Sequence, residues 1–146
     1  MALAGLLTAP RLGVRNEVCY RYRRSRDGSY MAEISDRHFD IFTSYETIYA
    51  FASEQSASIT ATVRAALFVH TMRHYVFALV KVPRSRRRDF FSRMTRDFRR
   101  WRPAEFAFLP GPRGVELRLV GRGAYRTYFA LYPLNRLRVE LSRRLR

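Results

Sequence analysis

The stretch TATVRAALFVHTMRHYVFALVKV, residues 60–82, decides the fold class of this 146-residue chain. Its apolar side chains recur at helical spacing, and in the second half of the stretch they occur on most sides of the helix. A helix with so broad an apolar surface has to be buried among neighbours. We therefore expect a central helix that begins at Ser58 or Thr60 and ends at Pro83.

A further helix is predicted on each side of this central helix. Residues 36–53 place aromatic side chains at helical spacing, and Ser35 or Asp36 can cap the helix. Residues 85–101 show the same spacing after a capping Ser85, with arginines on much of the remaining surface. Both patterns are typical of amphipathic helices that pack on a core.

The C-terminal third continues the helical pattern. We expect a loop over residues 106–114, which contain two prolines and two glycines, and then a helix over residues 115–131 that Gly121 and Gly123 weaken. Residues 134–146 are predicted to form a basic amphipathic helix with a stripe of leucines. The sequence therefore predicts a mainly α fold: a short N-terminal helix and a strand remnant, followed by a bundle of about four to five helices.

The N-terminal part shows a different pattern. Residues 2–8 are predicted to end a helix, which Pro10 terminates. Residues 18–23, VCYRYR, alternate in the manner of a half-buried strand, and a tight turn follows at residues 26–29. Because a strand needs a partner, this one either pairs with residues 12–14 or closes a sheet whose remainder is missing from these residues.

The run NEVCYRYRR at residues 16–24, followed by DGS at residues 27–29, resembles the closing segment of the catalytic domain in bacterial family 2 glycosyltransferases. Residues 37–42 and the helical region after them resemble the extension of this domain in actinobacterial cell-wall enzymes. Those enzymes include the poly(ribitol-phosphate) glycosyltransferases of wall teichoic acid and their glycerophosphotransferase fusions. The residues that match the family motif are Tyr20, Tyr22, Arg23 and Ser29.

The resemblance implies that residues 1–33 are the remnant of the end of a catalytic domain, and that residues 34–146 are a helical linker or accessory domain. Enzymes of this family need an Asp-x-Asp motif that holds a divalent ion on the nucleotide diphosphate, and a carboxylate base. This sequence has no Asp-x-Asp motif. We therefore expect a fragment of an enzyme for teichoic-acid-like cell-wall polymers, inactive alone, with no catalytic residues, metal or cofactor, and with the missing catalytic half as a partner.

The charge of the chain is its most unusual property. It has 28 basic and 12 acidic residues, a formal net charge of +16, and Lys81 is its only lysine. Such a field attracts polyanions, although arginines on a helix can also form an ordinary solvated face. The candidate contacts for a polyanion or a membrane surface are Arg84, Arg86, Arg87, Arg88, Arg99, Arg100, Arg136, Arg138, Arg143 and Arg144.

The alternative interpretation is therefore a small basic protein that binds nucleic acid or an anionic membrane surface. An anionic lipid surface or a phosphate polymer is favoured, because no helix-turn-helix or aromatic RNA-binding strand motif points to nucleic acid. The unpaired edge of the predicted strand favours a homo-oligomer. Because Cys19 is the only cysteine, we expect the protein in the reducing cytoplasm, including the inner face of the membrane.

His70 and His74 are four residues apart in the predicted central helix, a spacing at which two imidazoles can share a metal ion. No Asp or Glu lies between them, and His38 is distant in the sequence. Matches to ligand spacing without a third ligand are weak. We therefore expect hydrogen-bonded side chains, rather than a metal site, at this pair.

Overall fold

The computed structural model describes residues 33–55, 59–104, 106–108 and 110–133. The predicted N-terminal helix, the strand at residues 18–23 and the helix at residues 134–146 lie outside them. Every regular element of the described residues is helical, which confirms the predicted mainly α bundle for this part of the chain. The elements are the 3-10 helix η1 (Asp36–Phe39), α2 (Asp40–Glu54), α3 (Ala61–Leu79), the 3-10 helix η2 (Arg84–Arg86), α4 (Arg87–Trp101), α5 (Pro112–Arg122) and a last helix at residues 125–133.

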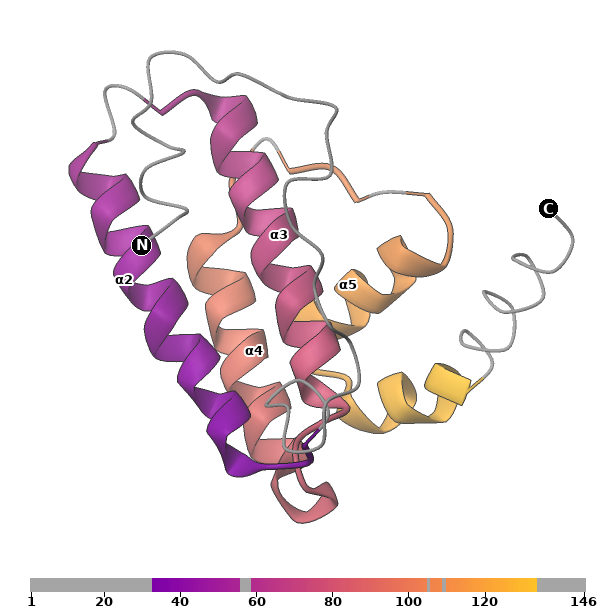
Figure 1. The fold of residues 1–146 in the computed structure, drawn as a ribbon. Helices are drawn as coiled ribbons and strands as arrows, with labels where there is room; N and C mark the ends of the chain where they lie inside the picture. Colours follow the sequence, from indigo (N-terminus) through magenta and orange to yellow (C-terminus); the bar gives the residue numbers. More distant parts are fainter. Residues whose placement is uncertain (1–32, 56–58, 105, 109, 134–146) are drawn as a thin grey trace, which may run out of the picture.

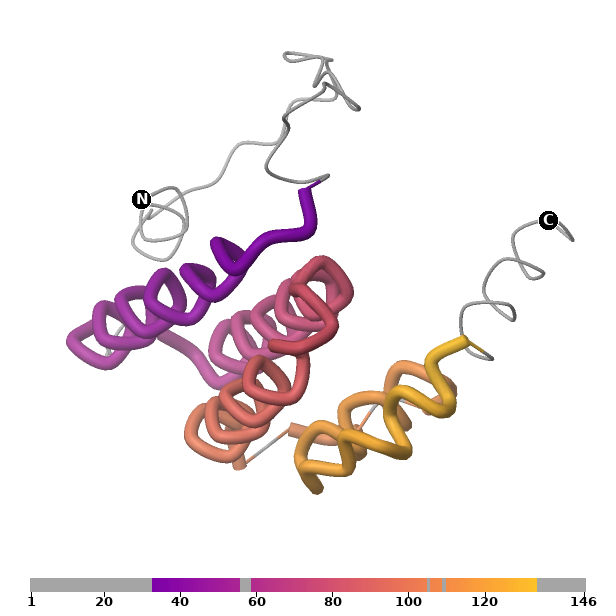
Figure 2. Tube along the Cα trace, turned by 90° about the horizontal axis from the view of Figure 1, so that it is seen from below, coloured from indigo at the N-terminus to yellow at the C-terminus, as the bar shows by residue number. Residues whose placement is uncertain are grey.

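Helices α2, α3 and α4 stand side by side and alternate in direction (Figure 1). Seen from below, α5 and the helix at residues 125–133 lie together on the side of α4 away from α2 (Figure 2). Helix α4 packs on α3 and on α5. The helix predicted at residues 60–82 is α3, and it shares the centre of the bundle with α4.

The core is built mostly of aromatic rings. Phe42 of α2, Tyr75 of α3 and Phe90 of α4 are fully buried, and the centroid of the Phe42 ring lies 4.6 Å from each of the other two. Phe91 packs on Tyr128 instead, with their ring centroids 5.2 Å apart. Two adjacent phenylalanines of α4, Phe90 and Phe91, therefore pack into the two halves of the bundle. Burial of each ring contributes about 1.5–3 kcal/mol to the stability of the fold.

Two of the three predicted helix caps are present in the structure, and the third is not. The Ser35 hydroxyl accepts a hydrogen bond from the Arg37 N–H at 3.2 Å, and the Thr60 hydroxyl accepts one from the Val63 N–H at 3.3 Å. These contacts confirm the predicted caps. The predicted cap at Ser85 is wrong: this residue lies within η2, and α4 begins at Arg87 without a side-chain cap.

The single helix predicted over residues 115–131 is wrong. The chain forms two helices there because Gly123 adopts a left-handed conformation, with φ at 71°. The N–H groups of Gly123 and Ala124 donate to the carbonyls of the last turn of α5, which ends that helix. The helix also begins earlier than predicted, with Pro112 at its start, because proline suits the first helical turn.

A close approach at Gly121 holds α5 against α4. A Cβ atom on this residue would lie 2.6 Å from Cε1 of Phe98 in α4. Only glycine allows this separation, because real Cβ contacts are longer. Because the two helices are so close, side chains at the edges of α4 and α5 lie next to one another at the surface.

None of the helices in the described ranges has both the length and the apolar character needed to cross a membrane.

Candidate polyanion-binding site

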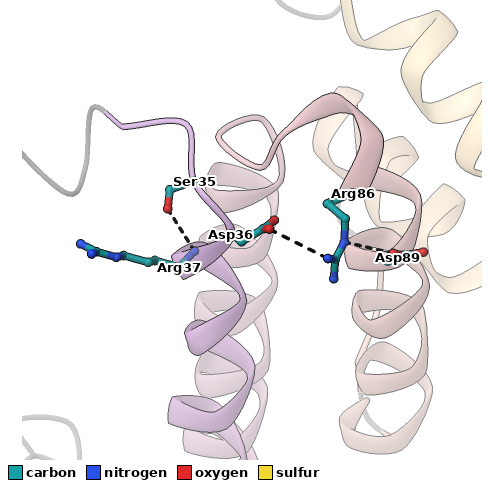
Figure 3. A network of polar contacts seen from close by, with 5 residues as sticks. All are labelled: Ser35, Asp36, Arg37, Arg86 and Asp89. Carbon is teal, nitrogen blue, oxygen red and sulfur yellow. Dashed lines mark hydrogen bonds and ion pairs between the residues drawn. The ribbon is translucent and has the colours of Figure 1, made fainter.

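The arginines at the start of α4 bind other parts of the protein. Figure 3 shows Arg86 between two carboxylates, with Nη1 3.9 Å from Asp36 Oδ2 and Nε 3.3 Å from Asp89 Oδ2. The Arg86 guanidinium also lies 5.2 Å from the centroid of the Phe39 ring. These contacts tie η1 to the start of α4, although exposed ion pairs of this kind contribute little stability.

Arg87 has a structural role as well. Its guanidinium donates from Nη2 to the carbonyl of Val80 at 2.9 Å and from Nε to the carbonyl of Val82 at 3.1 Å. Both carbonyls lie in the segment that follows α3, so Arg87 ties this segment to the start of α4. Arg93 lies outside both hollows described below, and its guanidinium is 4.6 Å from the centroid of the Phe42 ring.

The arginines that face α5 and the last helix surround a hollow of about 630 Å³. Arg88, Arg99 and Arg126 line it together with the hydroxyl side chains of Ser92 and Thr127. Among the described residues, no Asp or Glu contributes to its lining. The remaining lining residues are Phe91, Thr95, Gly123, Ala124 and Tyr125.

A second hollow, of about 560 Å³, adjoins the first and shares Arg99 with it. Arg102, Arg118 and Arg122 line it, again without a carboxylate from the described part of the chain. Arg99 Nε donates to the carbonyl of Gly121 at 3.1 Å, which places this side chain between the two hollows. We call the two hollows together the arginine groove, lined by Arg88, Arg99, Arg102, Arg118, Arg122 and Arg126.

The ten predicted arginines differ in where the structure places them. Arg88 and Arg99 lie in the arginine groove, whereas Arg86 and Arg87 contact protein groups and Arg84 is exposed in η2. Arg100 lines a third hollow, of about 690 Å³, which also contains the carboxylate residue Glu46. The other four arginines, and all four residues of the glycosyltransferase motif, lie outside the described residues: Arg136, Arg138, Arg143, Arg144, Tyr20, Tyr22, Arg23 and Ser29.

Four arginines of the groove were not predicted from the sequence: Arg102, Arg118, Arg122 and Arg126. Arg118 and Arg122 are four residues apart in α5, a spacing that places both side chains on one helical face, whereas Arg126 lies in the last helix, beyond the break at Gly123. This signal was present in the sequence, but it points to a site only because α5 packs back onto α4. Arg102 belongs to the same basic run as Arg99, and its place in the second hollow depends on the chain turning after α4.

A separate set of polar contacts joins the helices away from the groove. Tyr45 Oη of α2 lies 3.0 Å from Nδ1 of His70 and 2.8 Å from Nδ1 of His74, which confirms the predicted hydrogen-bonded histidines. The described ranges contain no group of three or more His, Cys, Asp or Glu side chains arranged to hold a metal ion. Burial, followed by the charges of His70 and Arg73, lowers the pKa of His74, so its neutral form is favoured.

The same set includes a buried carboxylate. The Tyr75 hydroxyl donates a hydrogen bond to Asp97 Oδ2 at 2.8 Å, which ties α3 to α4. Burial raises the pKa of Asp97, although the Tyr75 hydrogen bond acts in the opposite direction. Burial also raises the pKa of Tyr49 to about 12. These groups stabilise contacts between helices and do not reach the arginine groove.

No family model, curated protein or solved structure matches this chain.

Proposed function

We propose that this protein binds a flexible, phosphate-bearing chain along the arginine groove. The observation that carries the proposal is the convergence of six arginines on two adjoining hollows to which no described carboxylate contributes. A guanidinium stays charged at every physiological pH and donates two parallel hydrogen bonds to a phosphate. The hydroxyls of Ser92 and Thr127 add neutral donors at the first hollow.

The shape of the groove favours a flexible chain over a flat or rigid partner. Its arginines line recesses rather than a ridge, so an anionic bilayer or a stiff duplex would contact mainly their rims. A flexible chain can enter both hollows and pass Arg99, which they share. Successive phosphates then meet successive guanidinium groups. Binding inside the cytoplasm, including at the inner face of the membrane, is part of this proposal.

The test compares two variants of equal net charge for their affinity toward inorganic polyphosphate. The groove variant carries Arg88→Gln, Arg122→Gln and Arg126→Gln. The control variant carries Arg73→Gln, Arg84→Gln and Arg113→Gln, which replace exposed arginines outside both hollows. We expect the groove variant to lose roughly tenfold in affinity per removed contact at low salt, and about one unit of salt slope per contact.

Equal losses in the two variants would contradict the proposal, because overall charge alone would then explain binding. A second arm uses vesicles of phosphatidylglycerol and phosphatidylcholine. Binding to these vesicles that exceeds binding to polyphosphate, and that depends on the groove arginines, would assign the groove to a membrane surface instead.

The resemblance at residues 16–42 supports a second proposal, that the chain is the C-terminal part of a family 2 glycosyltransferase and is inactive alone. Its motif residues lie outside the described residues, so it stays a prediction from the sequence. The DNA immediately upstream provides the test. An in-frame nucleotide-binding half with an Asp-x-Asp motif is the expected result, and an unrelated or out-of-frame sequence there would end this proposal.

A further inference from the structure

Each hollow of the arginine groove contains a half-buried aromatic ring beside its arginines. Phe108 lines the second hollow, and Tyr125 lines the first. Phe108 lies in the segment between α4 and α5, and Tyr125 begins the last helix. Both rings are therefore at the surface where a bound chain would pass, unlike the fully buried rings of the core.

Phe108 is part of a stack of flat groups. The guanidinium carbons of Arg102 and Arg118 lie 5.6 Å and 5.5 Å from the centroid of its ring. The Phe98 ring lies nearly parallel to it, with an interplanar angle of 16° and a centroid distance of 6.2 Å. Aromatic rings and guanidinium planes are the two kinds of protein surface on which unpaired bases stack.

Tyr125 is held by two neighbouring rings. Phe91 meets it at a steep angle of 75°, with centroids 5.6 Å apart, and Phe129 lies 4.8 Å away. These contacts fix the position of the tyrosine ring beside Arg88 and Arg126 in the first hollow. A fixed ring loses little side-chain freedom when a base stacks on it.

We propose that the chain bound in the arginine groove is a single-stranded nucleic acid, an inference that rests on the proposed function above. Single-stranded nucleic acid is recognised by a basic groove that follows the backbone and by aromatic rings on which bases stack. The arginine groove combines both elements in each of its hollows. A polyphosphate or a polyol-phosphate chain has no ring to place on Phe108 or Tyr125, so these side chains give it no added affinity.

The first experiment varies the ligand and leaves the protein unchanged. The full chain is titrated with a thymidine oligonucleotide of about twelve nucleotides and with an abasic sugar-phosphate strand of the same length and charge. We expect the thymidine strand to bind roughly tenfold more tightly for each stacked base. Equal affinities for the two strands would overturn the inference, because the backbone alone would then account for binding.

The second experiment varies the rings. The double variant Phe108→Leu, Tyr125→Leu is expected to bind the two strands with nearly equal affinity, because it keeps every arginine of the groove. Phe77→Leu is the matched control, since Phe77 is 47% exposed and outside both hollows. Retained preference for thymidine in the double variant would contradict the assigned role of the two rings.

The outcomes separate this inference from the proposed function. If the groove variant binds the abasic strand as tightly as the wild type does, the arginine groove is not the binding site and both proposals fail. If the groove variant loses that affinity but no preference for bases is found, only the nucleic-acid inference fails. Melting curves show whether the double variant is folded. If it is not, the comparison of the thymidine and abasic strands on the wild-type protein decides whether the inference holds.

Discussion

The arginines at the start of α4 and those that face α5 are the same residue type in two different roles. Arg86 and Arg87 contact carboxylates and backbone carbonyls of the protein itself. Arg88 and Arg99 instead line hollows to which no described Asp or Glu contributes, although Arg99 Nε also donates to the carbonyl of Gly121. The contrast teaches that net charge overestimates the number of arginines that are available to a ligand. An arginine is open to a ligand where the fold places no carboxylate or carbonyl against its terminal Nη groups, and neighbours in sequence can differ in this respect.

The largest effect on binding from a single change is expected at Arg99. Because this side chain lines both hollows, Arg99→Glu places a carboxylate at the centre of the groove. We expect the affinity for a phosphate chain to fall about a hundredfold. The free energy of unfolding is expected to fall by about 1–2 kcal/mol, because the hydrogen bond to the Gly121 carbonyl is lost and a carboxylate lies in the last turn of α4. Arg113→Glu makes the same charge change outside the groove. An equal loss of affinity in that control would remove the distinction between the two sets of arginines.

Adjacent residues Arg87 and Arg88 offer the sharpest paired test. Arg87→Met removes two hydrogen bonds to carbonyls and is expected to cost about 2 kcal/mol of stability, without weakening phosphate binding of the folded protein. Arg88→Met is expected to do the reverse, lowering affinity about tenfold at unchanged stability. Urea denaturation and fluorescence anisotropy measure the two quantities. If both variants lower only stability, or both lower only affinity, the proposed difference between Arg87 and Arg88 is contradicted.

Much of the bundle could be predicted from the sequence. Aromatic spacing located α2 and α4, and an apolar surface on most sides located α3. Ser35 and Thr60 marked two helix starts. The break at Gly123 was missed because the apolar spacing continues across it, and only the left-handed backbone ends α5.

The arginine groove could be predicted only in part. Arg88 and Arg99 stand out as members of basic runs, but their relation to Arg122 and Arg126 is tertiary. It depends on α5 approaching α4 closely at Gly121. Local spacing carries no information about this approach, so a sequence pattern alone cannot separate groove arginines from structural ones.

A smaller effect is expected from a change in pH. It should alter the stability that depends on His74, but not the affinity of the arginine groove for phosphate. The pKa of His74 is lowered in the fold, so the unfolded chain binds this proton more readily. The His74 contribution is absent well above pH 6.5 and becomes destabilising as pH falls below that value. The difference in unfolding free energy between wild type and His74→Gln should show this slope from pH 8 to pH 5.

Phosphate binding should stay nearly constant over the same range, because arginine does not titrate there. A flat stability difference between the wild type and the His74→Gln variant would contradict the assigned effect of His74. A steep change in polyphosphate affinity, measured where the protein is folded and corrected for protonation of the ligand, would show that groups other than arginine bind the chain.

The smallest effect is expected at Arg86. Its two ion pairs are exposed, with 48% of the Arg86 side chain accessible, so Arg86→Gln should change stability by about 0.5 kcal/mol or less. The affinity for polyphosphate should also change little beyond the loss of one distant charge. A tenfold loss of affinity would place Arg86 in the binding site and extend the groove to the start of α4.

The central claim is that the groove arginines, and not those at the start of α4, contact the bound chain. The most direct measurement follows the side-chain Nε–Hε signals of the arginines by nuclear magnetic resonance during titration with the thymidine oligonucleotide. The account predicts saturable shifts for Arg88, Arg99 and Arg126, with Arg86 and Arg87 unchanged. Equal shifts across all arginines, or shifts confined to Arg86 and Arg87, would contradict it.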